Sequence, residues 1–432
     1  MLMHSWGRYP LQEAIIHTPG ERSDLMIHMK DSSTLLARGM GRSYGDSALA
    51  TQLIDTRRLN MLIDFDEANG FVCCESGLCL AELLTVVVLK GWFLPVTPGT
   101  KFVSVGGAVA SDVHGKNHHK QGCFSEHVIS LDVLLADGSI LTCSALQNAD
   151  LFHATCGGMG LTGIILTVRL QLHAIFSTDI AQMAYQTKGL QHTLELFEQH
   201  AQAMYSVAWI DCLASGRELG RAVLMLGETI VHGVLELSNR AQITLPCILP
   251  DRLLNHYTVK AFNTLYYHTA ARRIQQRLHY DAFFYPLDRI QYWNRLYGKR
   301  GFCQYQCVLP HAGALSGLNE LLKKIAASGR ASFLAVLKSL GPQNKNFLSF
   351  PFAGHTLALD FQIDDGLFAL LDELDAIVLA FGGRLYLSKD ARMSTDTFRR
   401  SYPNWQAFQQ VRAHYGALGK FRSNQSQRLG LD

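Results

Sequence analysis

The chain has 432 residues, of which 48% are hydrophobic and 17% are charged, and its formal net charge is +3. The 39 basic and 36 acidic residues nearly cancel, and no run of five basic residues occurs, so we do not expect a nucleic-acid-binding protein. At this length a single hydrophobic core stops growing, so two domains are expected.

The cysteines and the lack of targeting signals in the sequence indicate in which cellular compartment the protein is expected. The ten cysteines are scattered, without a CxxC pair or zinc-finger spacing, which favours free thiols in a reducing environment. The N-terminal stretch MLMHSWGRYPLQEA lacks the charged and apolar regions of a signal peptide. No apolar run approaches the roughly 18 residues of a membrane-spanning helix. We expect a cytoplasmic protein, at most attached to the inner face of a membrane.

Residues 1–175 have the pattern of an α+β unit whose loops carry glycine. Apolar runs predict strands at 35–37, 61–65, 71–75, 128–135, 140–143 and 164–172, and helices at 78–89 and 149–155. Asn69-Gly70 and Asp137-Gly138 predict tight turns between strands, and Gly91 predicts the end of a helix.

From about residue 176 glycine becomes rarer and the pattern changes. Amphipathic helices near 189–203 and 313–327 alternate with strands expected at 206–212, 221–225, 302–308, 331–338, 356–362 and 384–389. This alternation predicts an antiparallel sheet flanked by helices. The stretch 251–280 is rich in Tyr, His and Arg without clear periodicity, and we expect it to form a mobile flap over a site.

Three glycine-rich stretches each lie beside a predicted strand. They are RGMGRSYGD at 38–46, PGTKFVSVGGAVASDVHGKNHH at 98–119 and GGMGLTGII at 157–165. Glycine lets the main chain approach another molecule closely, and Ser104 can cap a short helix whose free N–H groups point at an anion. One such stretch alone would be a flexible surface loop, but three together favour a single extended phosphate-bearing ligand.

These stretches, together with YSVAWIDCLA, YQCVLP and GGRLYLSKDARM, resemble the PCMH-type (vanillyl-alcohol-oxidase type) FAD-binding oxidoreductases. Within that fold family they are similar to the oxidase subunits of decaprenylphosphoryl-β-D-ribose 2'-epimerases, from about Arg38 to Leu429. The resemblance implies an α+β fold with a PCMH-type FAD-binding domain at 1–175, completed by about 405–432. A substrate (cap) domain at 176–404 would hold the antiparallel sheet flanked by helices.

The resemblance implies FAD as the cofactor. The residues expected to bind FAD are Arg38, Gly39, Met40, Gly41, Arg42, Ser43, Tyr44, Gly45, Thr97, Gly99, Thr100, Val105, Gly106, Gly107, Ser111, His114, Gly115, Lys116, Asn117, Gly158, Gly163, Ile164 and Tyr386. Arg42 stands where many relatives carry a histidine that bonds covalently to the flavin. Since an arginine cannot form that bond, we expect FAD to be bound non-covalently.

Lys389, Gln306 and His114 are the expected catalytic residues. The family places a lysine needed for activity at the position of Lys389, where a fixed ammonium stabilises the negative charge that hydride transfer leaves on a flavin. Without the resemblance, a solvated lysine paired with Asp390 would be the simpler interpretation. The residue that removes the hydroxyl proton is not identified by the sequence.

The substrate is expected to meet one face of the predicted sheet. Gln304 and Gln306 share a face of their strand and can bind sugar hydroxyls, although a polar edge strand would look the same. The residues expected to bind substrate are Lys116, Tyr285, Leu287, Gln304, Gln306, Leu334, Val336, Lys338 and Lys389. Ala358 stands where the mycobacterial-type pocket has a cysteine, so its pocket shape and thiol-directed inhibition cannot be carried over. His114, His118 and His119 lie near no carboxylate or thiolate at ligand spacing, so no metal is expected.

By resemblance, the chain would oxidise the C2' hydroxyl of a polyprenylphosphoryl-β-D-ribose to a ketone. This step would be the first half of an epimerisation to the arabinose form, which an NAD(P)H-dependent keto-reductase partner would complete. A quinone or O2 would accept the electrons, and the lipid-linked substrate would favour peripheral membrane association. Two alternatives stay open: an aldonolactone or alditol oxidase that acts on soluble polyols, and a catalytically inactive FAD-binding scaffold.

Overall fold

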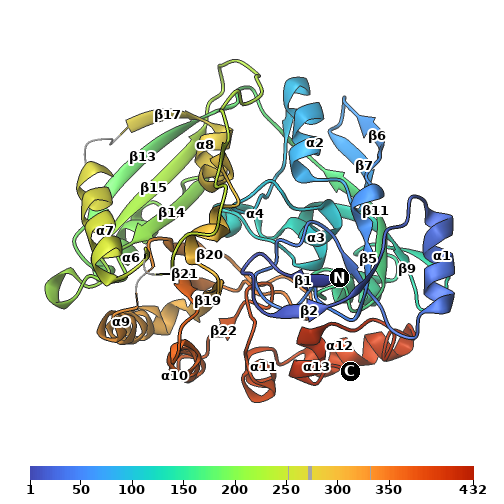
Figure 1. The fold of residues 1–432 in the computed structure, drawn as a ribbon. Coiled ribbons are helices and arrows are strands. Elements are labelled where there is room, and N and C mark those ends of the chain that lie inside the picture. Colours follow the sequence, from blue (N-terminus) through green and yellow to red (C-terminus); the bar gives the residue numbers. More distant parts are fainter. Residues whose placement is uncertain (252, 271–274, 331) are drawn as a thin grey trace.

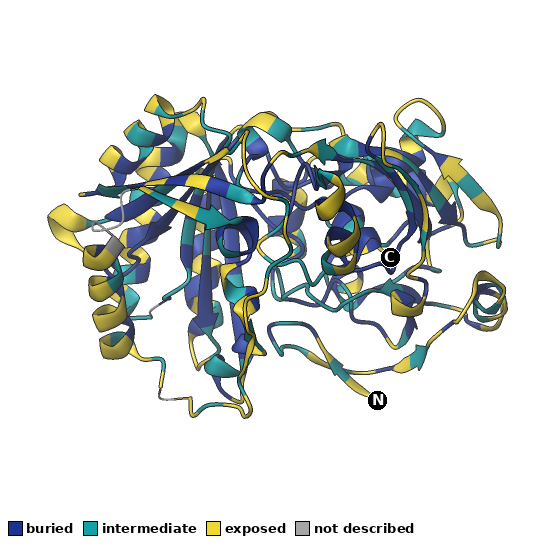
Figure 2. Cartoon of the chain, turned by 90° about the horizontal axis from the view of Figure 1, so that it is seen from above, coloured by how far each residue is buried: buried dark blue, intermediate teal, exposed yellow. Residues whose placement is uncertain are grey.

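The computed structural model describes residues 1–251, 253–270, 275–330 and 332–432. It is an α+β protein in which two sheet systems lie side by side, with helices on their outer faces (Figure 1). Buried residues concentrate along the inner strands and between the two systems, whereas exposed residues lie on the outer faces of the helices and in the connecting loops (Figure 2).

The N-terminal part contains a five-stranded antiparallel sheet in the order β10-β9-β11-β7-β6. Its strands are β6 (Leu62–Asp66), β7 (Phe71–Glu75), β9 (Val128–Leu134), β10 (Ile140–Cys143) and β11 (Ile164–Gln171). A parallel three-stranded sheet consists of β3 (Ile15–His17), β5 (Gln52–Asp55) and β4 (Leu36–Arg38). Two small antiparallel pairs are β1 (Leu2–His4) with β2 (Leu11–Glu13), and β8 (Trp92–Phe93) with β12 (His173–Ala174).

Five helices accompany these sheets. They are α1 (Arg22–Asp31), α2 (Leu80–Val87), α3 (Val105–Ala110), α4 (His118–Gln121) and α5 (Ala149–Thr155). In α2, Leu80, Leu83, Leu84 and Val87 are buried at helical spacing, which is the apolar stripe that the sequence predicts. The helix ends in a 3-10 turn before Gly91, whose φ of +81° is a left-handed conformation suited to glycine.

The larger sheet has eight antiparallel strands in the order β17-β13-β15-β14-β20-β21-β19-β22. Its strands are β13 (Asp179–Thr187), β14 (Tyr205–Ile210), β15 (Ala222–Thr229), β17 (Gln275–His279), β19 (Phe302–Pro310), β20 (Ala335–Leu340), β21 (Gly354–Gln362) and β22 (Arg384–Leu385). The helices beside it are α6 (Leu190–Gln199), α7 (His256–Ala270), α8 (Tyr280–Phe284), α9 (His311–Ser328) and α10 (Leu367–Ala380). A short parallel pair joins β16 (Ile243–Thr244) to β18 (Ile290–Gln291).

The last segment returns to the N-terminal part as α11 (Thr395–Ser401), α12 (Trp405–His414) and α13 (Asn424–Leu429). Leu35 bridges to Phe421, and the fully buried Arg412 donates hydrogen bonds to the carbonyls of Leu161, Phe421 and Leu431. The tail therefore packs against the N-terminal part, while its assignment to the FAD-binding domain stays a prediction.

Most predicted elements are confirmed to within a few residues, and two predictions are wrong. The strand expected at 384–389 ends at Leu385, because the Lys389 N–H bonds back to the Tyr386 carbonyl and closes a turn. The stretch 251–280 has regular secondary structure: it contains α7 and β17, and α8 begins at its last residue. Residues 252 and 271–274 of this stretch lie outside the described residues. So does Ala331 of the strand expected at 331–338.

The pattern of apolar residues does not predict the helix α7, because one of its inward positions is polar. Val259, Asn263 and Tyr267 are buried at a spacing of four residues, but Asn263 bonds to Asp211, and the Tyr267 hydroxyl bonds to the Thr187 carbonyl. Tertiary hydrogen bonds therefore take the place of an apolar stripe. The predicted mobility of this region stays a prediction.

Arg412 offers a direct test of how the tail is held. Arg412→Met removes the donors of three buried carbonyls, so we expect the free energy of unfolding to fall by about 3 kcal/mol. Arg400→Met is the matched control, because Arg400 is exposed and forms only a helix-surface pair with Asp396. Urea unfolding followed by circular dichroism measures both; equal stability of the two variants would contradict this account.

Candidate active site

One cavity of about 1040 Å³ lies between the glycine-rich loops and one face of the eight-stranded sheet. The helices α3 and α4 lie between the two sheet systems, so the loops before and between them face the larger sheet (Figure 1). The predicted residues that line the cavity are Gly39, Met40, Gly41, Arg42, Ser43, Tyr44, Thr97, Gly99, Thr100, Gly106, Gly107, Ser111, His114, Gly115, Lys116, Gly163, Leu287, Gln304, Gln306, Leu334, Val336, Lys338, Tyr386 and Lys389.

The loop after β4 presents unused hydrogen-bond donors to this cavity. In the part of the chain that the structure describes, the backbone N–H groups of residues 40–43 have no hydrogen-bond acceptor. The Ser76 hydroxyl also lines the cavity and is buried without a partner among those residues. The half-buried residues 40–43 line the cavity, so their free N–H groups are suited to an anionic ligand such as the pyrophosphate of FAD.

The start of α3 brings a second segment of backbone to the same place. Ser104 caps this helix by accepting from the Gly107 N–H at 3.2 Å. A Cβ atom at Gly106 would lie 2.7 Å from the Ser76 Cβ, so only glycine permits this close approach. The glycine pair in the sequence therefore has a steric cause beside the cavity.

Alternation along three neighbouring strands builds the opposite wall. Ala358 of β21 pairs with Gln306 of β19 on one side and with Val336 of β20 on the other. Two residues along these strands, Gln304 pairs with Asp360 and donates a hydrogen bond to its carboxylate at 2.6 Å. Side chains at alternate positions share a face, which explains why these residues meet in one cavity.

His114 lies at the junction of the two walls. It is buried, its Nε2 atom is 3.1 Å from the Gln306 Nε2 atom, and its ring packs against Tyr386 and Phe350. Burial, reinforced by the charges of Lys338, His118 and Lys389, holds the pKa of His114 well below its usual range. His114 is therefore neutral at physiological pH, and it accepts a hydrogen bond when its proton sits on Nδ1.

Of the other two histidines of this stretch, His118 lies edge-on to the His114 ring at 6.3 Å between centroids, but each of the two has a hydrogen-bond partner of its own. His118 accepts from the Gly341 N–H through Nδ1 at 2.9 Å, and the His119 ring contacts the Ala203 carbonyl at 2.8 Å. Both therefore have structural contacts away from a common centre.

Three lysine ammonium groups share the cavity. Burial lowers the pKa of Lys116 and of Lys389 to about 7, and the pKa of Lys338 to about 8. Lys389 lies 3.8 Å from the centre of the Tyr44 ring, and Lys116 contacts the ring and carbonyl of Phe283. So many cations in one enclosed space favour anionic ligands.

Asp360 is the functional candidate that sequence reasoning missed. Its side chain is fully buried, lines the cavity and also accepts a hydrogen bond from the Tyr297 hydroxyl at 3.3 Å. Burial raises the pKa of Asp360 to about 7. A signal exists in the sequence: Thr356, Ala358 and Asp360 alternate with Leu357, Leu359 and Phe361, which puts a carboxylate on the small, polar face of a strand.

Part of the cavity lining is apolar, and we call this part the apolar arm. Its walls are Val207 and Trp209 of β14, Met225 of β15, and Phe262 and Tyr266 of α7. The Tyr266 ring packs on the Trp209 indole at 4.7 Å between centroids. The helix α7, which lies in the stretch predicted to be a flap, therefore forms one wall of this arm.

The remaining predicted residues do not line the cavity. They are Arg38, Gly45, Val105, Asn117, Gly158, Ile164 and Tyr285. Several hold lining residues in place: the Tyr285 hydroxyl bonds to Thr97 at 2.6 Å, and the Asn117 amide donates to the Pro95 carbonyl at 2.8 Å.

Comparisons with known proteins agree with this geometry. Residues 16–144 match the model of an FAD binding domain. The decaprenylphosphoryl-β-D-ribose oxidase of Mycolicibacterium smegmatis is 36% identical over 411 residues, which cover 92% of this chain and 89% of that protein. The chain belongs to the FAD-dependent oxidoreductase family of this oxidase. Enzymes of this PCMH-type family act on CH–OH groups with FAD, and so does this chain.

Other relatives of this FAD-dependent oxidoreductase differ in how much of the chain they match. An uncharacterized protein in the mprA 5' region of Streptomyces coelicolor is 32% identical over 82% of the chain and all of its own length. The L-gulonolactone oxidase of Mus musculus is 30% identical over only 35% of the chain and 34% of its own length. The likeness to lactone oxidases is thus confined to about a third of the chain.

The negative charge of Asp360 should have a measurable effect on the pKa of Lys389 in this oxidoreductase. Burial lowers the pKa of Lys389 while the Asp360 carboxylate opposes that change, so Asp360→Asn should move the pKa further below 7. The neutral amine would then appear at lower pH. Acylation of Lys389 across a pH series, quantified by peptide mass spectrometry, measures this pKa directly.

Asp288→Asn is the matched control, because Asp288 also lines the cavity but interacts with the backbone and side chain of Lys101. It should leave the pKa of Lys389 unchanged. An unchanged pKa in Asp360→Asn as well would show that this carboxylate does not act on Lys389.

Proposed function

We propose that this oxidoreductase oxidises the C2' hydroxyl of a polyprenylphosphoryl-β-D-ribose to a ketone. The observation that carries the proposal is a single cavity that joins unused backbone donors, three lysines and an apolar arm. Such a cavity matches a nucleotide cofactor and a substrate with a polar sugar phosphate and a long apolar chain. The relative from Mycolicibacterium smegmatis, named for a substrate of this class, supports the assignment.

We assign the cofactor end to the glycine-rich loops. The N–H groups of residues 40–43 and the start of α3 would hold the pyrophosphate of FAD, and Tyr386 would pack near its ring system. When bound, FAD accepts the hydride that leaves the carbinol carbon. Lys389 supplies a fixed positive charge at the same end of the cavity, where negative charge develops during the reaction.

We assign the sugar and its phosphate to the sheet wall. Gln304 and Gln306 offer amides to sugar hydroxyls, and Lys338 and Lys116 offer cations to the phosphate. His114 stays neutral and, with its proton on Nδ1, can accept a hydrogen bond from a sugar hydroxyl at Nε2. Asp360 can also hold a proton near neutral pH, because burial raises its pKa to about 7. The apolar arm under α7 would take the start of the polyprenyl chain.

The proposed reaction implies partners. A ketone at C2' becomes the arabinose form only after a second hydride arrives from the opposite face, so we propose an NAD(P)H-dependent keto-reductase as the partner enzyme. A quinone or O2 would take the electrons from the reduced protein.

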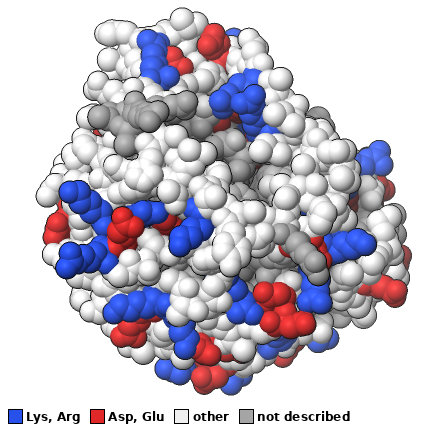
Figure 3. All heavy atoms as spheres, turned by 60° about the vertical axis from the view of Figure 1, so that its left-hand side comes forward, with Lys and Arg blue, Asp and Glu red and all other residues white. Residues whose placement is uncertain are grey.

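A lipid-linked substrate also implies contact with a membrane surface. None of the helices in the described part of the chain has the length and apolar character needed to cross a bilayer. Both signs of charge are interspersed on the face seen in Figure 3, with wide uncharged areas between them. We therefore propose peripheral association at the inner face of the membrane.

Anaerobic mixing tests the substrate class. Purified yellow protein should lose its flavin absorbance with polyprenylphosphoryl ribose and keep it with ribose, free polyols or aldonolactones. Bleaching by the soluble sugars instead would move the assignment to an aldonolactone or alditol oxidase. No bleaching with any of these compounds would support an inactive FAD-binding scaffold.

Removing the ammonium group tests the role of Lys389. Lys389→Ala should keep its bound flavin but slow anaerobic flavin reduction by roughly 100- to 1000-fold, the usual effect of losing one electrostatic donor at a developing charge. Stopped-flow absorbance measures this rate. Lys323→Ala, at an exposed position of α9, is the control and should match the parent; an equally fast Lys389→Ala would remove Lys389 from the mechanism.

The mode of FAD attachment is tested by denaturation. Arg42 lines the cavity, donates to the Phe102 carbonyl at 3.0 Å and stacks on Trp6, and its guanidinium has no route to a flavin bond. We expect guanidinium chloride followed by ultrafiltration to move all of the yellow colour into the filtrate. Colour that stays with the polypeptide would mean a covalent flavin.

A further inference from the structure

Three segments that are distant in the sequence meet directly behind Lys389. Arg428 of α13 donates two hydrogen bonds to Asp46, at 3.1 Å from Nε and 2.7 Å from Nη2. The same Nη2 atom donates to Asp390 at 2.8 Å. Asp46 ends the first glycine-rich stretch, and Asp390 directly follows Lys389. One guanidinium therefore joins the loop assigned to the cofactor to the loop that carries the catalytic lysine.

The two carboxylates need this cation. The side chains of Asp46 and Asp390 are only 5% and 6% exposed, and both accept from the same Arg428 group. Two buried carboxylates that contact the same side chain repel each other, and a positive charge between them offsets this repulsion. The other oxygen of Asp390 accepts from the backbone N–H groups of Arg392 and Met393, so its side chain is tied to the course of its own loop.

The two loops are also in direct contact. The Tyr44 N–H donates to the Ser388 carbonyl at 2.9 Å, and a Cβ atom at Gly45 would lie only 1.6 Å from the Asp390 carbonyl oxygen. Lys389 extends from this junction and lies over the Tyr44 ring. The place of its ammonium group in the cavity therefore depends on how closely the two loops are held.

The helix α13 is anchored on both sides of the junction. The Gln425 amide donates to the Leu387 carbonyl at 2.8 Å, and the Asn424 N–H donates to the Leu49 carbonyl at 2.7 Å. Arg428 itself does not line the cavity. Any effect it has on the reaction must therefore pass through the loops that it joins.

We propose that Arg428 is a positioning residue, which holds Lys389 at its place in the cavity by clamping Asp390 to Asp46. The inference rests on the role proposed above for Lys389 and goes beyond it by placing part of the reaction machinery in the C-terminal helix. An arginine suits this task because its planar guanidinium can satisfy two carboxylates at once, whereas a lysine presents a single point charge.

A double-mutant cycle tests whether Arg428 acts through Lys389. Without the clamp the two carboxylates separate, and a displacement of about 1 Å at a reacting group can cost roughly 100-fold in rate. We expect Arg428→Met to slow flavin reduction at saturating substrate by about 10- to 100-fold, with little change in KM. In a Lys389→Met background the same change should cost nothing further, because the group that it positions is gone.

A second measurement does not depend on turnover. The pKa of Lys389 is lowered to about 7 by burial, with the Asp360 carboxylate and the Lys338 ammonium facing it from the sheet and the Tyr44 ring beneath it. If Arg428→Met releases the loop, the ammonium gains water and its pKa should rise toward the usual value for lysine. Acylation of Lys389 in the flavin-free protein, followed by peptide mass spectrometry across a pH series, reports this shift.

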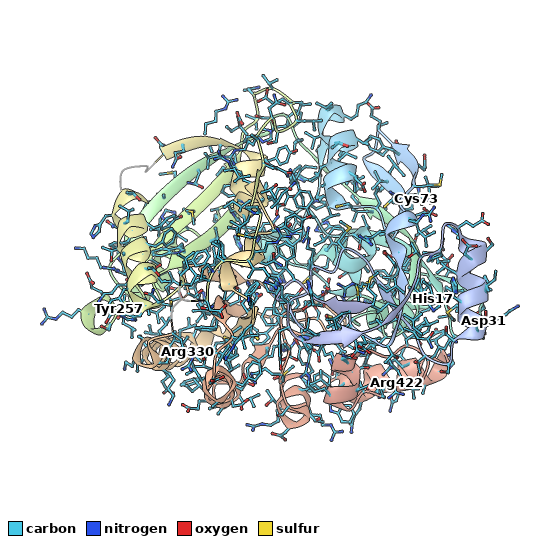
Figure 4. The ribbon with its side chains drawn as sticks, viewed as in Figure 1. His17, Asp31, Cys73, Tyr257, Arg330 and Arg422 are labelled. Carbon is cyan, nitrogen blue, oxygen red and sulfur yellow. The ribbon has the colours of Figure 1, made fainter. Side chains whose placement is uncertain are left out.

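Arg422→Met is the matched control. Arg422 is another arginine of the same tail, pairs with Asp432, and lies on the outer side of the molecule near α12 (Figure 4). It should leave both the reduction rate and the pKa of Lys389 unchanged. If Arg428→Met does not give folded, flavin-loaded protein, Arg428→Lys and Asp390→Asn carry the same two measurements.

The outcomes separate the two proposals. A Lys389→Met protein that reduces flavin at the parent rate would overturn the role of Lys389, whatever Arg428 does. If Lys389→Met slows flavin reduction but Arg428→Met slows it further by its full factor in the double variant, the positioning role is overturned and the role of Lys389 stands. The same holds if the pKa of Lys389 is unchanged in Arg428→Met.

Discussion

The rest of this structure depends on three lysine ammonium groups that line one cavity together with the Asp360 carboxylate. Taking a charge out of water is costly unless it is paired, and burial lowers the pKa of each of the three lysines. An anionic ligand stabilises the protonated form of each lysine when it binds. The same field contributes to holding His114 neutral, so one side of the cavity can accept hydrogen bonds while the other attracts negative charge.

The sheet is what allows such a concentration of polar groups. Trp209, Val336, Ala358 and Gln306 lie in one row across four strands, because each pairs with the next in register. The residues between them along each strand face the core and are apolar, as Leu357 and Leu359 are. A polar reaction surface and a hydrophobic core therefore share the same strands, and the alternation of the chain keeps them apart.

The sequence predicts this arrangement where local chemistry decides the structure, and fails where distant contacts do. The glycine-rich stretches and the Gln304/Gln306 pair carry local signals, Lys389 was expected from the family resemblance, and residues of each line the cavity. Asp360 was missed because the alternation along its strand shows which face the carboxylate is on but not what that face meets, and its importance comes from residues on other strands. The helix α7 was missed because its inward Asn263 is satisfied by Asp211, about fifty positions earlier in the chain. At the turn 386–389 the Tyr386 N–H donates to the Gln306 carbonyl of the neighbouring strand, while the Lys389 N–H donates back to the Tyr386 carbonyl; the first of these bonds is a distant contact that the local sequence does not reveal.

The strand order of the large sheet sets the length over which the cavity extends. Neighbouring strands are spaced by about 4.8 Å, so the five steps from β21 through β20, β14, β15 and β13 to β17 cover roughly 24 Å. The cavity has lining residues on each of these six strands, from Asp360 on β21 to Leu278 on β17. A ligand long enough to cross all six strands would meet one strand after another, and the size of the side chains on β13 and β17 would set how much of it the cavity encloses.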